Sequence, residues 1–191
     1  GTDLRPSFIY PLSTISSDGR RLALSSFLRC GEREDLPWGL MVFDLEGPSA
    51  RVVVQGNTWT NMHPQYCRSG DADASHDVMI QHNHSHFFDI RGVRHSSPGG
   101  LGNDIHVIQD DGTNLRCLPW GRDPRERQAG HECWVGRTTS AISGVHDAAG
   151  QGHLVWGEPI PDAGHLGMNT PGARRNVLSR EFDRPDLIHF G

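Results

Sequence analysis

The chain has 191 residues with 23 acidic and 18 basic side chains, and its formal net charge of −5 disfavours a nucleic-acid surface as the main partner. All 18 basic residues are arginine, so lysine chemistry is excluded within this chain, and arginine or a metal must neutralise any bound carboxylate. No apolar run approaches the length that crosses a bilayer and no signal peptide opens the chain, so we expect no membrane partner and a cytoplasmic location, with the periplasm as the alternative.

The first predicted unit contains four strands between about residues 10 and 56. Residues 12–24 form a strand, an Asp18-Gly19 turn and a second strand, and Asp-Gly between apolar runs is a strong hairpin signal. Residues 39–45 and 50–54 are β-prone runs on either side of a Gly-Pro turn, so they predict a second hairpin.

The second predicted unit covers about residues 61–120. It has a short strand at 64–67 and another at 77–82, followed by a Gly-, Ser- and His-rich insertion at 85–102. A hairpin follows at 104–118, because the turn Asp111-Gly112 separates two β-prone runs.

The third predicted unit covers about residues 129–185. Strands are expected at 132–136, 138–143 and 153–156, and a helical turn at 173–178. Nothing in the chain keeps a 3.6-residue apolar period, so we expect very little helix.

Paired strands that recur every 50 to 70 residues are typical of the blades of a β-propeller. The chain is therefore predicted to be all-β, a single domain over 1–191 with three to four antiparallel blades, and the alternative is a β-sandwich. Because a closed propeller needs at least about four blades, we expect the chain to be part of a longer protein. An open set of blades exposes sheet edges, which allows self-association.

The four cysteines are widely separated and form no Cys-x-x-Cys pair: Cys30, Cys67, Cys117 and Cys133. This spacing does not support a zinc ribbon or a redox motif. Buried thiols are the simplest interpretation, and one or two disulfides are the alternative.

Histidines are the main clue to function, and five of the twelve lie between residues 61 and 86. His63 opens the second unit and His131 opens the third, so both are expected to face a common axis. His82, His84 and His86 alternate along one strand and would share a face if the strand persists. All of these histidines are candidate metal ligands or proton carriers. The alternative for His131 is a hydrogen bond to a backbone carbonyl, and the alternative for His82 and His84 is that they line a polar channel.

Five short motifs occur in a fixed order: His63-Pro-Gln-Tyr, Gln81-His-Asn, the hairpin from Asp104, Gly130-His-Glu-Cys-Trp, and Gly164-His-Leu-Gly-Met-Asn. This series resembles the oligogalacturonate lyase family and its relatives, which are seven-bladed propellers related to TolB-type repeats. The resemblance covers most of the chain from about Leu12 onward.

The resemblance implies a divalent metal, Mn²⁺ in the first place, held near the axis by histidines and a glutamine. It implies that His63 is the general base and that His131 is a metal ligand. The family's other ligands come from a Gln-x-x-His-x-His motif in a later blade, and no such motif follows His131. The family's catalytic arginine falls on the strand that here reads Trp38-Gly39-Leu40.

The resulting hypothesis is metal-assisted β-elimination on an oligomeric uronate. Such an elimination needs a base, charge neutralisation of the carboxylate, and an acid for the leaving oxygen. A non-catalytic propeller that binds a carbohydrate or a protein partner is the alternative.

Several further residues are expected at the sugar site: Asn61, Gln65, His82, Trp134 and His165. Trp134 could stack on a pyranose face, or it could only pack between blades. Glu132 is expected to point away from His131 by strand alternation. The remaining histidines, His86, His95, His106, His146 and His153, are expected on the surface or in loops.

Overall fold

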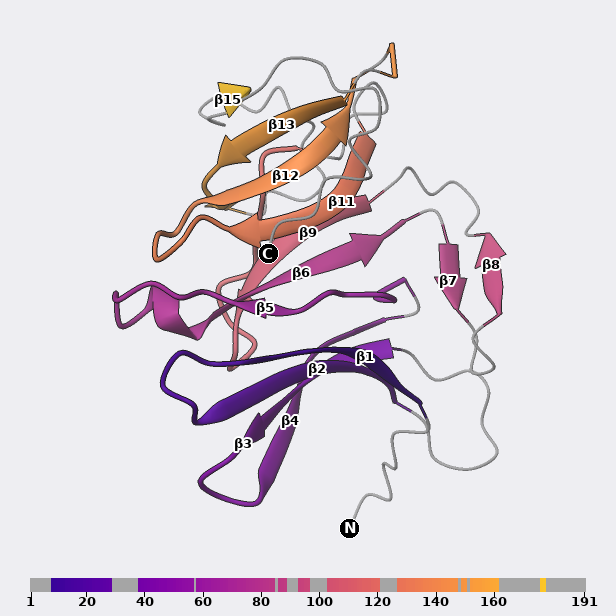
Figure 1. The fold of residues 1–191 in the computed structure, drawn as a ribbon. Helices are drawn as coiled ribbons and strands as arrows, with labels where there is room; N and C mark the ends of the chain where they lie inside the picture. Colours follow the sequence, from indigo (N-terminus) through magenta and orange to yellow (C-terminus); the bar gives the residue numbers. More distant parts are fainter. Residues whose placement is uncertain are drawn as a thin grey trace.

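The computed structural model describes residues 8–28, 38–56, 58–84, 86–88, 93–96, 103–120, 127–147, 149–150, 152–161 and 176–177. These residues form an all-β fold with three antiparallel sheets of four, five and four strands and one separate two-stranded ribbon. The three sheets follow one another in chain order and lie side by side, as Figure 1 shows. The prediction of an all-β chain is confirmed.

The first sheet is a simple meander. Its strands, in both chain order and spatial order, are β1 (Phe8–Ile15), β2 (Arg21–Phe27), β3 (Trp38–Asp44) and β4 (Ser49–Gly56). The predicted turn between β1 and β2 is confirmed: Gly19 has φ +75°, a conformation that glycine adopts without a steric penalty.

The second sheet has five strands in the order β14-β10-β9-β6-β5. Their bounds are β5 (Gln65–Tyr66), β6 (Asp77–Asn83), β9 (Asn103–Gln109), β10 (Arg116–Cys117) and β14 (Ile160–Pro161). One 3₁₀ turn, η1 (Ala74–His76), precedes β6. β14 comes from the chain region assigned to the third unit but pairs with β10, so the units in sequence and the sheets in space do not coincide there.

The third sheet has the order β11-β12-β13-β15. Its strands are β11 (Arg127–Trp134), β12 (Ala141–His146), β13 (Gly152–Gly157) and β15 (Asn176–Val177). The expected helical turn at 173–178 is wrong at residues 176–177, because these residues pair with Val155 and Trp156 of β13. Within the insertion at 85–102, β7 (His86–Phe88) and β8 (Arg94–Ser96) form the separate ribbon.

Two apolar clusters join the sheets. One lies between the first and second sheets and includes Leu40, Val42, Val78 and Ile80. The other lies between the second and third sheets and includes Met79, Val107, Val145 and Val155. Adjacent residues of β6 therefore face opposite neighbours, as expected for a strand that is buried on both faces.

The first strands of successive sheets are also linked by hydrogen bonds. The backbone N–H of Tyr66 in β5 donates to Thr14 Oγ1 in β1 over 3.1 Å. The indole N–H of Trp134 in β11 donates to the carbonyl of Gln65 in β5 over 3.0 Å. These contacts bring the residues just before β5 close to those of β11.

The three described sheets do not close into a ring. Among the described cysteines, Cys67, Cys117 and Cys133 form no disulfide with one another. Cys67 and Cys117 are buried, which agrees with the buried-thiol interpretation for these two; Cys30 lies outside the described residues.

Candidate functional site

Three polar residues with left-handed backbone lie just before β5 (Asn61 and His63) and within β11 (His131). Asn61 has φ +57°, His63 has φ +47° and His131 has φ +57°. Among the described residues, Asn114 is the one other non-glycine residue with positive φ. Backbone strain of this kind costs of order 1–3 kcal/mol per residue and occurs preferentially at functional sites. The strain therefore marks this region as a candidate site.

His63 is held in place by its neighbours. Its Nε2 lies 2.8 Å from Asn61 Oδ1, and because a carbonyl oxygen only accepts, Nε2 carries the proton and Nδ1 has the lone pair. Nδ1 faces Glu132 Oε1 at 3.8 Å. Burial, and then the charge of His131, lower the pKa of His63 below its ordinary value. His63 is therefore a neutral imidazole at neutral pH, which is the form a general base requires.

The segments that carry the two histidines meet, because Glu132, the residue after His131, approaches His63 Nδ1 at 3.8 Å; that both rings face a common axis stays a prediction. Asn61 also belongs to the cluster, since it fixes the His63 ring. Gln65 is turned toward the third sheet, where its Nε2 donates to the Glu132 carbonyl over 2.6 Å.

Glu132 is the residue whose role the sequence prediction missed. Its side chain is only 1% exposed, and neither carboxyl oxygen has a hydrogen-bond partner among the other described residues. Burial raises the pKa of Glu132 from 4.5 to about 7. Strand alternation predicted that Glu132 points away from the site, but the positive φ of His131 breaks that alternation, and the carboxyl group approaches His63.

Trp134 is buried, with 8% exposure, in the apolar cluster between the second and third sheets. Together with its hydrogen bond to Gln65, this position favours the packing interpretation over stacking on a sugar. His165 lies outside the described residues.

A second polar cluster lies at the same end of the second sheet, on the face toward the first sheet. His82 at the end of β6 is directly opposite Asp104 in β9, and Ile80 is opposite His106. Side chains that are directly opposite, or two residues apart, share a face, so His82, Asp104 and His106 meet. One ligand atom from each lies within 4.8 Å of the others.

Asp104 is the centre of this second cluster. Its Oδ1 lies 2.9 Å from His84 Nε2, 3.1 Å from His106 Nε2 and 3.8 Å from His82 Nδ1. Burial opposes its ionised form, but hydrogen bonds from His106 and His84 outweigh burial and hold the pKa of Asp104 well below its ordinary range. The carboxylate is therefore ionised throughout the neutral range.

The expected shared face of His82 and His84 agrees with their ring centroids, which are 4.1 Å apart. The prediction that His106 lies on the surface or in a loop is wrong, since it lies in β9 and is 3% exposed. His95 is exposed as expected. The patterns Asp104-x-His106 and His82-x-His84 are each visible in the sequence. The strand register that places the two pairs opposite each other is not.

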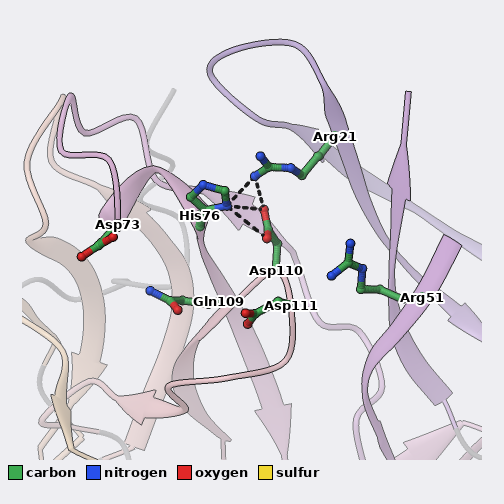
Figure 2. A pocket seen from close by; sticks show the side chains of 7 residues that line it. All are labelled: Arg21, Arg51, Asp73, His76, Gln109, Asp110 and Asp111. Atoms are coloured by element: carbon green, nitrogen blue, oxygen red, sulfur yellow. Dashed lines mark hydrogen bonds and ion pairs between the residues drawn. The ribbon is translucent and has the colours of Figure 1, made fainter. Parts of the chain in front are cut away.

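The opposite end of the second sheet has a pocket of about 340 Å³. Figure 2 shows its lining, which consists of Arg21, Arg51, Asp73, His76, Gln109, Asp110 and Asp111. Arg21 Nη1 donates to Asp110 Oδ2 over 2.7 Å and to His76 Nδ1 over 2.5 Å. Tyr66 Oη also donates to Asp110 Oδ2, over 3.2 Å.

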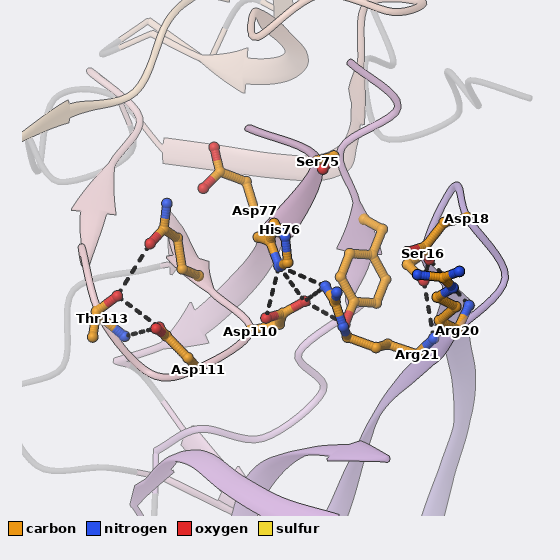
Figure 3. A network of polar contacts seen from close by, with 12 residues as sticks. Ser16, Asp18, Arg20, Arg21, Ser75, His76, Asp77, Asp110, Asp111 and Thr113 are labelled. Atoms are coloured by element: carbon orange, nitrogen blue, oxygen red, sulfur yellow. Dashed lines mark hydrogen bonds and ion pairs between the residues drawn. The ribbon is translucent and has the colours of Figure 1, made fainter. Parts of the chain in front are cut away.

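This network, drawn in Figure 3, links the first sheet to the second. Burial, and then the charge of Asp110, raise the pKa of Tyr66. Because its charged groups bond one another and connect two sheets, we interpret the network as structural.

Comparisons with protein-family models, curated proteins and solved structures find no match to this chain. Among the described residues, no helix has the length and apolar character needed to span a bilayer.

Proposed function

We propose that the three sheets are successive blades of a β-propeller related to the oligogalacturonate lyases, and that the chain performs β-elimination on an oligomeric uronate. The order of the sequence motifs supports this, as does the side-by-side arrangement of meander sheets whose first strands are adjacent. The observation that carries the proposal is the approach of His63 to the buried carboxyl group of Glu132 at 3.8 Å, with both His63 and His131, the residue before Glu132, in strained backbone.

In this proposal His63 is the general base. Its side chain is 31% exposed, so a substrate can reach it, and its pKa is lowered, so it is unprotonated at neutral pH. His63 removes the proton next to the uronate carboxylate, and the electron pair of that C–H bond forms the new carbon–carbon double bond as the neighbouring carbon–oxygen bond breaks. The leaving sugar oxygen takes its proton from water. The imidazolium that forms is stabilised by Glu132, whose pKa of about 7 allows it to ionise near neutrality.

In this proposal His131 binds the carboxylate of the substrate. The resemblance implies a metal at His131, but the group of metal-ligating side chains found among the described residues is His82, Asp104 and His106, which does not include His131. The described neighbours of His131 therefore do not fit a metal site by themselves, and no step of the elimination is assigned to a metal.

The second candidate function is a non-catalytic propeller that binds a carbohydrate. The strand where the family has its catalytic arginine supports this alternative. Trp38 is 2% exposed, and a Cβ at Gly39 would lie 2.6 Å from Leu28 Cδ1, so this position belongs to the core and offers no cation.

The test is to mix the protein with oligogalacturonate and follow the ultraviolet absorbance of an unsaturated product. We expect turnover by the wild type, and a decrease in kcat of about 10²- to 10⁴-fold in His63→Gln, with a smaller effect on KM, because general base catalysis contributes that much. His153→Gln, which lies in a separate pair with Asp147, is the control. Binding of the oligosaccharide without product by the wild type would favour the non-catalytic function, and unchanged kcat in His63→Gln would refute the role of His63.

A further inference from the structure

The polar cluster around Asp104 has the composition and the spacing of a metal site. Three imidazole nitrogens, from His82, His84 and His106, point at one carboxylate oxygen over 2.9 to 3.8 Å. Zinc–nitrogen and zinc–oxygen bonds are about 2.0–2.2 Å long, so tetrahedral ligand atoms lie about 3.3–3.5 Å apart. The distances to Asp104 Oδ1 bracket this value, and one ligand atom from each of His82, Asp104 and His106 lies within 4.8 Å of the others. Side-chain rotations of these three residues, and a larger rotation of His84 toward them, accommodate an ion.

The surroundings of His82 resemble those of a metal-bound histidine. Its Nδ1 faces Asp104, and its other nitrogen, Nε2, lies 2.7 Å from Thr58 Oγ1. A histidine that binds a metal through one ring nitrogen usually bonds a polar group through the other, which fixes its ring. Trp59 stacks on the His82 ring with centroids 3.8 Å apart and an interplanar angle of 7°. The hydrogen bond of Thr58 at the edge of the ring and the stacked Trp59 on its face therefore both fix the orientation of His82.

Burial distinguishes this cluster from an ordinary surface group of histidines. The side chains of Asp104 and His106 are 0% and 4% exposed, whereas His82 and His84 are 14% and 22% exposed. Burying a carboxylate together with three imidazoles costs free energy unless their charges and lone pairs are compensated. In this structure the N–H groups of His84 and His106 compensate the carboxylate. A divalent cation that displaces their protons would take over that role, and the two more exposed histidines leave a path for its entry.

We propose that His82, His84, Asp104 and His106 bind one divalent transition-metal ion of the zinc class. Imidazole nitrogens suit zinc and its neighbours, whereas magnesium and calcium prefer oxygen ligands. Four protein ligands fill a tetrahedral site, so the ion has a structural role. It joins β6 to β9 and, through Thr58, holds the segment that leads to Asn61 and His63. This proposal is independent of the proposed elimination activity.

The test is a titration of protein that carries no histidine tag and has been freed of metal with a chelator. Co²⁺ is the probe, because a tetrahedral Co²⁺ site absorbs visible light far more strongly than an octahedral one. We expect one equivalent to bind with the tetrahedral spectrum and without a thiolate charge-transfer band, since no cysteine is a ligand. Zn²⁺ should displace Co²⁺ and raise the melting temperature. Failure to bind, or a weak octahedral spectrum, would overturn the proposal.

Variants locate the ion. Asp104→Asn and His106→Gln should each weaken binding by more than the 10- to 100-fold that loss of an outer partner costs. His84→Gln, at the most exposed of the ligands, should also weaken it and serves if a buried variant does not fold, which circular dichroism would detect.

Two controls separate this site from others. His153→Gln removes a histidine from a separate histidine–aspartate pair and should bind Co²⁺ as the wild type does. His131→Gln should also bind normally. Loss of binding in His131→Gln, with retained binding in His84→Gln, would place the ion at His131 in the middle of β11 and refute the proposal.

Discussion

The buried carboxyl group of Glu132 is expected to make the protein less stable as the pH rises toward neutrality. Burial raises its pKa from 4.5 to about 7. Between these values the folded chain keeps a proton that the unfolded chain has released. The free energy of unfolding therefore decreases as the pH rises through this window, and the contribution of Glu132 becomes constant above it.

The size of the stability change follows from the width of the pH range between the two pKa values of Glu132. One pKa unit corresponds to about 1.4 kcal/mol, so the ionisation of Glu132 costs about 3 kcal/mol of stability. Solvent screening removes little of this, since the side chain is 1% exposed. Glu132→Gln keeps the shape of the protonated carboxyl group and cannot ionise. We expect the variant to match the wild type at pH 4.5 and to be more stable by about 3 kcal/mol at about pH 8, which raises Tm by roughly 6–12 °C.

The assay is urea unfolding of both proteins over this pH range, followed by tryptophan fluorescence. His63 is the neighbouring titratable group, but it is present in both proteins, so the difference between them isolates Glu132. Glu46→Gln, at a side chain that is 65% exposed, is the control for the substitution itself. A stability difference that stays constant from pH 4.5 to about pH 8 would refute the reasoning.

Two further substitutions test the packing of the sheets. Asp110→Asn should lower the free energy of unfolding by about 2–3 kcal/mol, because Arg21, 25% exposed, loses its carboxylate partner. Urea denaturation measures this change, and a variant as stable as the wild type would show that the network contributes nothing. Gly39→Ala should cost about 1–3 kcal/mol, because its methyl group would lie 2.6 Å from Leu28 Cδ1. Gly47→Ala, where nothing lies within 4 Å, is its control, and equal melting temperatures for the two variants would contradict the packing argument.

The strand pattern of the described chain follows largely from local sequence. Asp18-Gly19 lies between two β-prone runs, and Gly19 supplies the positive φ that the turn requires. β15 is different: residues 176–177 contain no signal that distinguishes a strand from a helical turn, and their conformation depends on pairing with β13. The same holds for β14, whose partner β10 lies more than forty residues earlier in the chain.

For the candidate site, the sequence by itself determined which chemistry is present: histidines at the starts of two units, a His-x-His pair, and no lysine. It could not determine which of these groups meet, because register between strands and packing between sheets are non-local. The tertiary structure decided that Asp104 and His106 join His82, since β6 and β9 pair in that register. It also decided that Glu132 turns toward His63, since the left-handed backbone of His131 interrupts the alternation that a regular strand would impose.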